Sequence, residues 1–233
     1  MLGRKTANVI RFCLDEMLPP FLRDNYYFMY PLFYIWYKGK NVKRLMNFKS
    51  VFHQLSQAEF EQYYKDYDTL PERETDLTLG SVKFILNQLD ADKQIKILDV
   101  GCGYGYILSQ IRNLGYENIL GVDLANQIKY PNIPIQIANI EKLPFEDKSF
   151  DTVICSHTLE HVINIRQTIC ELKRVTAKKL IITVPRQKYY KYTFDLHIHF
   201  FPQISYLLNL LNIDEQNYTY TNKDGDWTVV CQM

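Results

Sequence analysis

The stretch SHTLEHV, residues 156–162, brings two imidazoles and a carboxylate close together at His157, Glu160 and His161. Positions i, i+3 and i+4 share one face if this stretch is helical. A histidine exchanges protons near neutral pH, so such a face could supply a general base that the glutamate orients. The same three side chains could instead ligate a divalent metal ion.

These letters also satisfy H-x-x-E-H, the signature of one group of zinc peptidases. A peptidase of that kind needs a third ligand and long flanking helices. The segment directly upstream, DTVICS, is short and rich in apolar and β-branched residues, which is typical of a buried strand. A zinc peptidase therefore stays a remote alternative, and we expect the motif to lie just past the carboxyl end of a strand.

A glycine-rich turn is the second candidate for chemistry. It follows the strand-like segment IKILDV, which carries Asp99 near its end. The turn consists of Gly101, Cys102, Gly103, Tyr104 and Gly105. Glycines at this place let a ligand approach the backbone at the carboxyl edge of a sheet. The spacing G-x-G-x-G differs from the dinucleotide fingerprint and lacks the Lys-Ser/Thr of a P-loop, so a phosphate ligand is disfavoured.

An acidic residue follows the turn at a distance that suits a ribose. The next strand-like segment, ENILGVD, ends in Asp123, which is 18 residues after Gly105. An acid about 20 residues beyond a glycine turn is typical of a ribose-binding carboxylate. The turn and the acid together predict a nucleoside-type ligand at one edge of a sheet.

The elements that must position these residues form an alternating pattern. We predict strands at 95–100, 151–156 and 180–185, and helices at 107–114 and 163–175. Such an order is typical of an α/β fold with parallel strands and right-handed crossovers. A further helix after Pro202 and a closing hairpin complete the prediction. The stretch LANQIKYPNIP is barely long enough for a crossover helix, so the sequence does not determine how that side of the sheet is packed.

Composition limits the class of protein. The chain has 233 residues, of which 47% are apolar and 23% charged, which is the balance of a globular protein. The formal net charge of +1 gives no reason to expect a nucleic-acid partner. The five cysteines are scattered and form no C-x-x-C pair, which favours reduced thiols in a cytoplasm over a thiolate zinc site. Arg11 interrupts the first apolar stretch, so we expect no export signal.

Four segments together resemble the class I S-adenosylmethionine-dependent methyltransferases, particularly the group that includes the ubiquinone-biosynthesis methyltransferases. The segments are ILDVGCGYGYIL, GVDL, ANIEKLPFEDKSFDTVICSHTLEHV and LIITVPR, within residues 78–187. The resemblance implies a Rossmann-like, mostly parallel seven-stranded sheet with a C-terminal antiparallel hairpin. It also implies S-adenosylmethionine as cofactor.

The resemblance assigns roles to individual positions. Gly101 to Gly105 would wrap the methionine part of the cofactor, and Asp123 would hold the ribose. Leu124 would lie against the adenine, whose edge Asn139 and the amide of Ile140 would read. The cofactor set that it implies is Asp99, Gly101, Cys102, Gly103, Gly105, Asp123, Leu124, Asn139, Ile140 and Ser156. Many members of the family carry Asp where this chain has Asn139, and an amide oxygen can still accept a hydrogen bond there.

The acceptor and the base remain open at this point. Either His157 or His161 could be the general base, with Glu160 orienting one of them. Some relatives with E-x-x-E-H at this place are metal-assisted, so a divalent ion at His157, Glu160 and His161 is an alternative, to which His197 or His199 might contribute. A further alternative is a protein that binds the cofactor but catalyses no reaction.

The N-terminal residues differ in composition from the rest. We predict a helical, aromatic-rich extension over residues 1–77 and a methyltransferase domain over 78–233. Residues 26–37 are too short for a membrane span of about 20 residues and are followed by several lysines. They could form a lid over the core or a peripheral contact to the inner face of a membrane. The leader also resembles that of bacterial surface-polysaccharide methyltransferases, which implies O-methylation of a saccharide, free or lipid-linked.

Overall fold

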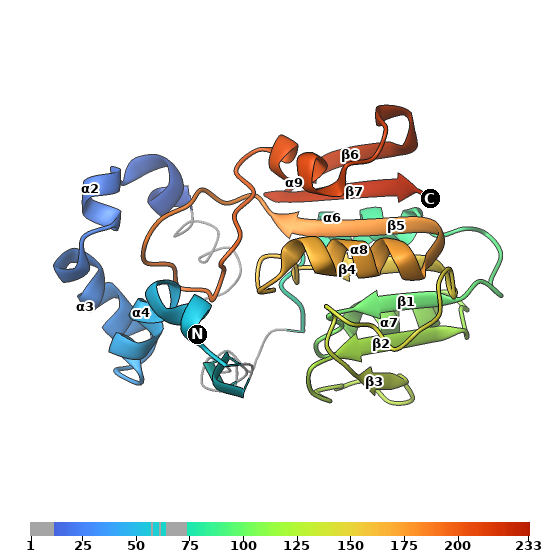
Figure 1. Ribbon diagram of the computed structural model, residues 1–233, viewed down its shortest axis with the longest axis horizontal. Coiled ribbons are helices and arrows are strands. Elements are labelled where there is room, and N and C mark those ends of the chain that lie inside the picture. The colour runs from blue at the N-terminus through green and yellow to red at the C-terminus, as the bar shows by residue number, and fades with distance from the viewer. Residues whose placement is uncertain (1–11, 57, 61, 64–73) are drawn as a thin grey trace. The chain divides into compact units, whose positions relative to one another are not determined.

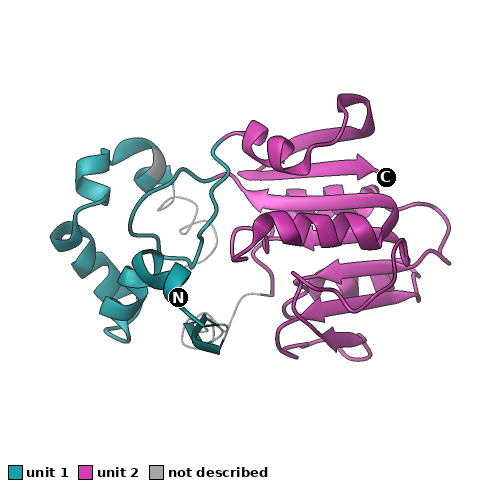
Figure 2. Cartoon of the chain, viewed as in Figure 1, with its two compact units in different colours: residues 1–72, 187–202 teal, residues 73–186, 203–233 magenta. Residues whose placement is uncertain are grey.

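The computed structural model describes residues 12–56, 58–60, 62–63 and 74–233. The chain divides into two compact units, which Figure 2 shows in different colours. The helical unit comprises residues 1–72 and 187–202, and the sheet unit comprises residues 73–186 and 203–233. The segment 187–202 thus joins the helical unit, although the sequence places it inside the domain that begins at residue 78. The expectation of no export signal concerns residues 1–11, which lie outside the described residues.

A seven-stranded sheet forms the centre of the sheet unit (Figure 1). The strand order is β3-β2-β1-β4-β5-β7-β6. The strands from β3 to β5 are parallel, whereas β7 runs antiparallel to both β5 and β6. The strands are β1 Ile97–Val100, β2 Ile119–Asp123, β3 Ile135–Ile137, β4 Phe150–Ser156, β5 Thr176–Pro185, β6 Tyr218–Lys223 and β7 Asp226–Gln232. The predicted mostly parallel sheet with a closing antiparallel hairpin is confirmed.

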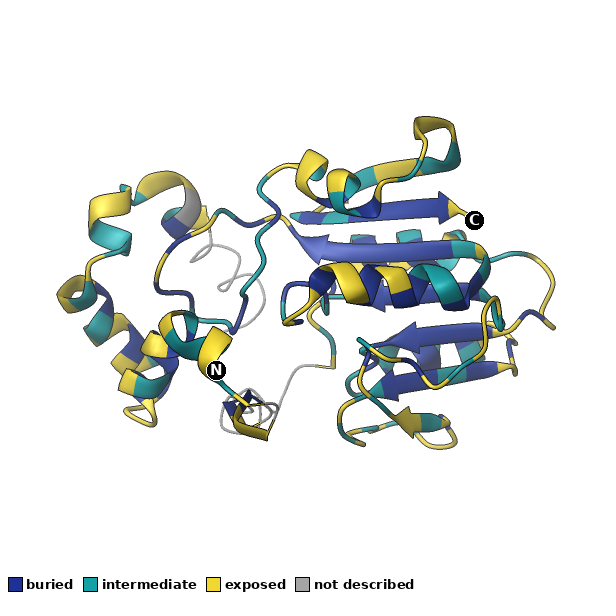
Figure 3. Ribbon diagram, in the orientation of Figure 1, coloured by how far each residue is buried: buried dark blue, intermediate teal, exposed yellow. Residues whose placement is uncertain are grey.

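Apolar runs explain why these strands lie in the centre. Every residue of β1 is buried, as are the last six residues of β5, because helices cover both faces of a parallel sheet. Figure 3 shows the burial along these strands. β5 begins at Thr176, directly after a helix, and is longer than the predicted strand 180–185.

Four helices pack on the sheet. They are α6 Leu79–Asn87, α7 Tyr106–Asn113, α8 Ile165–Val175 and α9 Ile204–Leu211. In Figure 1, α8 and α9 lie on one face, and α6 and α7 on the other. Side chains fix two of the starts: Thr78 accepts a hydrogen bond from the backbone N–H of Ser81, and Asn164 accepts one from that of Gln167. The predicted helices are confirmed with shifts of one or two residues at their ends.

The connection from β2 to β3 contains no helix in the described chain. A loop replaces it and covers the glycine turn. The backbone N–H of Lys129 donates to the carbonyl of Tyr104 at 3.0 Å, and a Cβ on Gly105 would lie 2.8 Å from Ile128 Cδ1. The sequence is barely long enough here for a crossover helix, and the structure has a loop that buries Ile133 in the core on this side of the sheet.

The helical unit has a core of its own, rich in aromatic side chains. Its described elements are a π-helical turn η1 Cys13–Met17, α2 Pro20–Arg23, α3 Tyr26–Trp36, α4 Val42–Val51 and a 3-10 turn η2 Phe52–Gln54. Phe33 stacks on Phe194 with ring centroids 4.6 Å apart, and Lys49 Nζ donates to the carbonyl of Tyr190 at 2.6 Å. Burial lowers the pKa of Lys49 to about 7, although Asp195 and Asp24 oppose this effect. None of the helices described has both the length and the apolar character needed to cross a membrane.

We predict that Gly121→Ala destabilises the sheet unit. A Cβ on this β2 residue would lie 2.6 Å from Cys102 Sγ and 2.9 Å from Leu108 Cδ1. Overpacking of this kind costs about 1–3 kcal/mol of unfolding free energy, measurable by urea denaturation. Adding Cys102→Ala removes the sulfur, so the double variant should lose less stability than the two single losses summed. Strict additivity would show that the sulfur is not the obstacle.

Candidate functional site

The glycine turn presents open backbone at the carboxyl edge of the sheet. Gly101 has φ +75°, and a Cβ there would lie 2.1 Å from Thr158 Oγ1, so only glycine fits. Gly103 has φ +50°, but a Cβ there would meet nothing within 4 Å. Gly103 is therefore a place where a ligand can approach the main chain.

Asp123 at the end of β2 is tied directly to this turn. Its carboxylate accepts the backbone N–H of Gly103 at 2.8 Å and that of Leu124 at 2.7 Å. Burial raises the pKa of Asp123, although hydrogen bonds from Gly103, Leu124 and Ala125 work in the opposite direction. The acid and the turn that the sequence singled out thus form one site.

Asp99 adds a second carboxyl close to Asp123. Its side chain is only 2% exposed, and burial together with the charge of Asp123 raises the pKa of Asp99 to about 7. Two acids with raised pKa values at one edge repel each other when both are ionised. A ligand that carries positive charge would relieve this repulsion, whereas a phosphate would increase it.

Strand β3 brings the predicted adenine-reading residues to the same edge. Asp123 pairs with Ile137, and its carbonyl accepts the N–H of Ala138 at 3.0 Å, so Asn139 follows directly. Asn139 Oδ1 accepts the N–H of Glu141 at 2.8 Å and retains a second lone pair. Ile140 is buried.

Two predicted cofactor residues lie differently from the others. The Cys102 side chain packs back against Gly121 in the core, so only its backbone can face a ligand. Ser156 ends β4, and its buried Oγ has no hydrogen-bond partner in the part of the chain that the structure describes. Leu124, beside Asp123, has an exposed side chain, as a residue lying against a flat ring requires.

The stretch with His157, Glu160 and His161 is a turn, so the predicted helix face is wrong. His157 has φ +50°, and α8 begins only at Ile165. The backbone N–H of His161 donates to the carbonyl of Thr158, which closes a single turn after β4. The left-handed backbone of His157 excludes this residue from any helix that contains Glu160 and His161.

This turn still gathers the three side chains around Glu160. His157 Nδ1 lies 3.7 Å from Glu160 Oε1, and a ligand atom of His161 lies within 4.8 Å of one of Glu160. Glu160 is fully buried and His161 is half-buried. The other two histidines proposed for a metal set, His197 and His199, belong to the helical unit.

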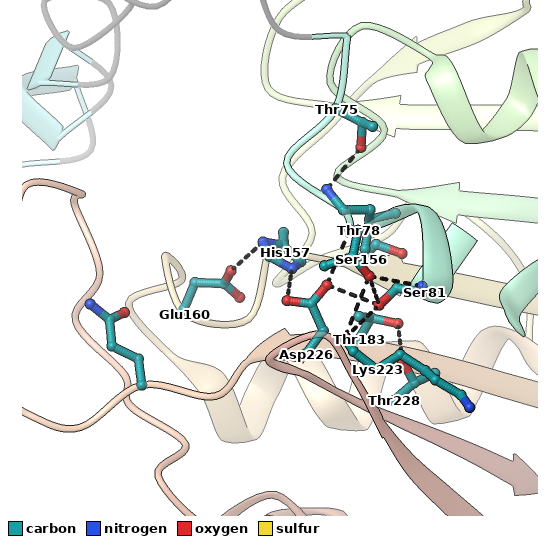
Figure 4. A network of polar contacts seen from close by, with 12 residues as sticks. Thr75, Thr78, Ser81, Ser156, His157, Glu160, Thr183, Lys223, Asp226 and Thr228 are labelled. Carbon is teal, nitrogen blue, oxygen red and sulfur yellow. Dashed lines mark hydrogen bonds and ion pairs between the residues drawn. The ribbon is translucent and has the colours of Figure 1, made fainter. Parts of the chain in front are cut away.

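Asp226 is a site residue that the sequence did not reveal. It begins β7, and its Oδ1 lies 3.1 Å from His157 Nε2 (Figure 4). Its Oδ2 accepts the Ser81 hydroxyl at 2.9 Å and the Thr78 N–H at 3.3 Å. The turn after β4, the start of α6 and the start of β7 are thereby joined by one polar network. In sequence Asp226 reads only as the last residue of a hairpin loop, NKDGD, and gives no further signal.

The network places His157 between the carboxylates of Asp226 and Glu160. Burial alone would lower the pKa of His157, but Asp226 and then Glu160 outweigh it and raise that pKa above its usual value. For Asp226, burial raises the pKa, yet His157 and the hydrogen-bond donors lower it overall. The two directions agree: Asp226 favours the protonated form of His157, and His157 favours the ionised form of Asp226.

We predict that Asp226→Asn destabilises the protein most in mildly acidic solution. A raised His157 pKa stabilises the fold fully below about pH 6.5, and this stabilisation is lost as pH rises through the raised value. The pKa of Asp226 is lowered in the folded protein, so its carboxylate stabilises the fold at pH values above the ordinary pKa of 3.8. This stabilisation is lost as the pH falls through the lowered pKa of Asp226. The variant should lose about 2–4 kcal/mol of unfolding free energy near pH 6 and less near pH 9.

Asp224→Asn, which alters an exposed acid of the same hairpin, is the matched control and should show no such pH dependence. An equal loss for Asp226→Asn at both pH values would mean that the ion pair contributes nothing.

Comparisons with known proteins agree with this geometry. Residues 98–182 match a family described as "Methyltransferase domain". The chain is 34% identical over 113 residues to an uncharacterized protein of Methanocaldococcus jannaschii, which covers 47% of this chain and 49% of that protein. It is 32% identical over 105 residues to the ubiquinone biosynthesis O-methyltransferase of Rickettsia prowazekii, covering 39% of this chain and 41% of that enzyme. The chain thus spans half or less of the length of these relatives.

A solved structure shares the fold. The S-adenosylmethionine-dependent methyltransferase of Aquifex aeolicus superposes with a TM-score of 0.53 over 76% of this chain and 98% of that one. The sequence identity is 14%, so this likeness concerns the fold alone.

Proposed function

We propose that this protein, whose sheet unit carries a class I S-adenosylmethionine-dependent methyltransferase domain, transfers a methyl group to a hydroxyl of a small molecule. The observation that carries the proposal is the hydrogen bond from the Gly103 N–H to the Asp123 carboxylate. This bond holds the acid and the glycine turn together at the carboxyl edge of the sheet. The relative from Rickettsia prowazekii is named as an O-methyltransferase, which favours oxygen as the acceptor atom.

The residues at this edge suit S-adenosylmethionine. Gly103 leaves room for the ligand, and the raised pKa values of Asp99 and Asp123 mark a site that favours a positively charged ligand. Asp123 would accept the ribose hydroxyls, while Leu124, Asn139 and Ile140 would contact the adenine. When bound, the cofactor supplies a methyl group that its sulfonium already activates.

The remaining task for the chain is to align the acceptor and remove a proton from its hydroxyl. We favour His161 as the base, because Asp226 stabilises the protonated form of His157, which cannot accept a further proton. Glu160 lies beside both histidines and can stabilise the proton that His161 takes. His157 then acts as a positioning residue that fixes the turn carrying Glu160 and His161.

A saccharide, free or lipid-linked, is the acceptor class we favour. Its support is the resemblance of the leader to surface-polysaccharide methyltransferases. Radiolabelled methyl transfer to sugar nucleotides and lipid-linked saccharides, with soluble phenols as comparison, tests this choice. Methylation of the phenols alone would contradict it.

A metal-assisted O-methyltransferase is the second candidate. The observation in its favour is the spacing of 3.7 Å between His157 Nδ1 and Glu160 Oε1, with His161 close to the same carboxylate. Elemental analysis of protein never exposed to chelator would find about one divalent ion per chain if it holds. A zinc peptidase fits less well, because the turn lacks the helix that such a site needs. Turnover of the cofactor would exclude a protein that only binds it.

We predict opposite effects of two substitutions on the affinity for S-adenosylhomocysteine. Asp123→Asn should weaken binding about tenfold or more, because charge-assisted bonds are lost. Asn139→Asp should strengthen binding a few-fold, because a carboxylate accepts stronger bonds than an amide oxygen. Isothermal titration calorimetry measures both, with Glu146→Gln, an exposed acid, as control. Equal affinities in all variants would refute the assigned cofactor site.

We also predict that His161→Gln lowers kcat by about 100- to 10,000-fold without changing the affinity for S-adenosylhomocysteine. A glutamine cannot accept the hydroxyl proton at neutral pH, so the loss should fall on the chemical step. Methyl-transfer kinetics on the acceptor found above measure it. A variant that keeps its kcat would show that His161 is not the base.

A further inference from the structure

Helix α3 of the helical unit is apolar on all sides. Its inner side packs Met29 and Phe33 into the core. The outer face of α3 is defined here by Tyr27, Phe28, Pro31, Leu32, Tyr34 and Ile35, all of which are exposed. Tyr27 is 85% and Ile35 75% exposed. Figure 3 shows exposed residues along this helix.

A helix that is hydrophobic all round is normally buried in a core or in lipid. With 11 residues, α3 is too short to span a bilayer, which needs about 20. Contiguous apolar patches of this kind are uncommon on soluble proteins and mark interaction surfaces. The outer face of α3 therefore needs a partner that can cover a helix lying flat.

The charges beside this face are positive. Between residues 26 and 55 the chain carries five Lys and Arg residues and no Asp or Glu. Three exposed lysines follow α3: Lys38 and Lys40 in the turn, and Lys43 in the first turn of α4. This turn folds back on the helix, because the N–H of Gly39 donates to the carbonyl of Tyr34 at 2.8 Å, and a Cβ on Gly39 would lie 3.1 Å from the Tyr34 ring. The basic turn thus borders the apolar face.

We propose that the outer face of α3 and its lysine border bind an anionic membrane surface. An interfacial helix buries apolar side chains at the boundary between headgroups and acyl chains, while lysines contact anionic headgroups. Tyrosines such as Tyr27 and Tyr34 suit this depth, since the ring is apolar and the hydroxyl stays in the polar layer. The charge pattern favours this partner over a second copy of the chain, whose lysines would repel these.

The test is co-sedimentation of the full chain with vesicles of phosphatidylcholine alone or mixed with equal parts of phosphatidylglycerol. The protein should bind the anionic vesicles and bind the neutral ones far more weakly. Combined Lys38→Gln, Lys40→Gln and Lys43→Gln should reduce the affinity about a hundredfold. Tyr27→Ser with Ile35→Ser should reduce it about tenfold or more on the same vesicles.

Matched controls test whether binding depends on the outer face of α3 and its lysines or on exposed lysines and apolar side chains anywhere on the protein. Lys83→Gln, Lys142→Gln and Lys148→Gln remove three exposed lysines of the sheet unit, and Leu114→Ser removes an exposed apolar side chain there. All of these should leave binding unchanged. Circular dichroism confirms that each variant is folded. The proposal would be overturned by equal binding to both vesicle types or by no binding to either. It would also be overturned by concentration-dependent dimerisation that Ile35→Ser abolishes. The experiment contains no cofactor or acceptor, so its outcome is independent of the proposed methyl transfer.

Discussion

The pairing of a buried carboxylate with an open backbone amide governs the proposed active edge of the sheet. Asp123 can hold the Gly103 N–H only because β1 and β2 are parallel neighbours, so that their carboxyl ends lie side by side. The parallel pairing of β2 with β3 places Asn139, two residues after β3, at the same edge. Burial of the acids is therefore a consequence of sheet order. This burial is the reason why we expect a positively charged ligand at this edge.

On the other side of β1, β4 leads into the turn that carries His157, Glu160 and His161. Its last residue is followed by His157, whose left-handed backbone turns the chain away from the strand. Asp226 enters from β7, beyond β5, and fixes the imidazole. Burial would lower the pKa of this imidazole, but Asp226 raises it overall, which supports our proposal that His161 accepts the proton. In this proposal, one neighbouring carboxylate gives two chemically identical side chains different roles.

The sequence was a good guide where local patterns determine structure. Apolar runs predicted β1, β4 and the core of β5, and glycines followed by Asp123 predicted the ligand edge, because both depend on neighbours in the chain. The helix expected at His157–His161 did not form, since the spacing i, i+3, i+4 says nothing about a left-handed residue at its start. Asp226 escaped notice because its partner is 69 positions away. The attachment of residues 187–202 to the helical unit is likewise a long-range effect, made by aromatic packing such as Phe33 on Phe194.

The most direct test of the proposed cofactor site is titration of the unmodified protein with S-adenosylhomocysteine by calorimetry over a range of pH. We predict a one-to-one complex at neutral and alkaline pH that weakens as pH falls through the raised pKa of Asp123, because protonation removes the charge that strengthens its bonds to the ribose hydroxyls. Absence of binding at every pH, or binding that strengthens on acidification, would contradict the central claim that this carboxylate and the glycine turn form the cofactor site.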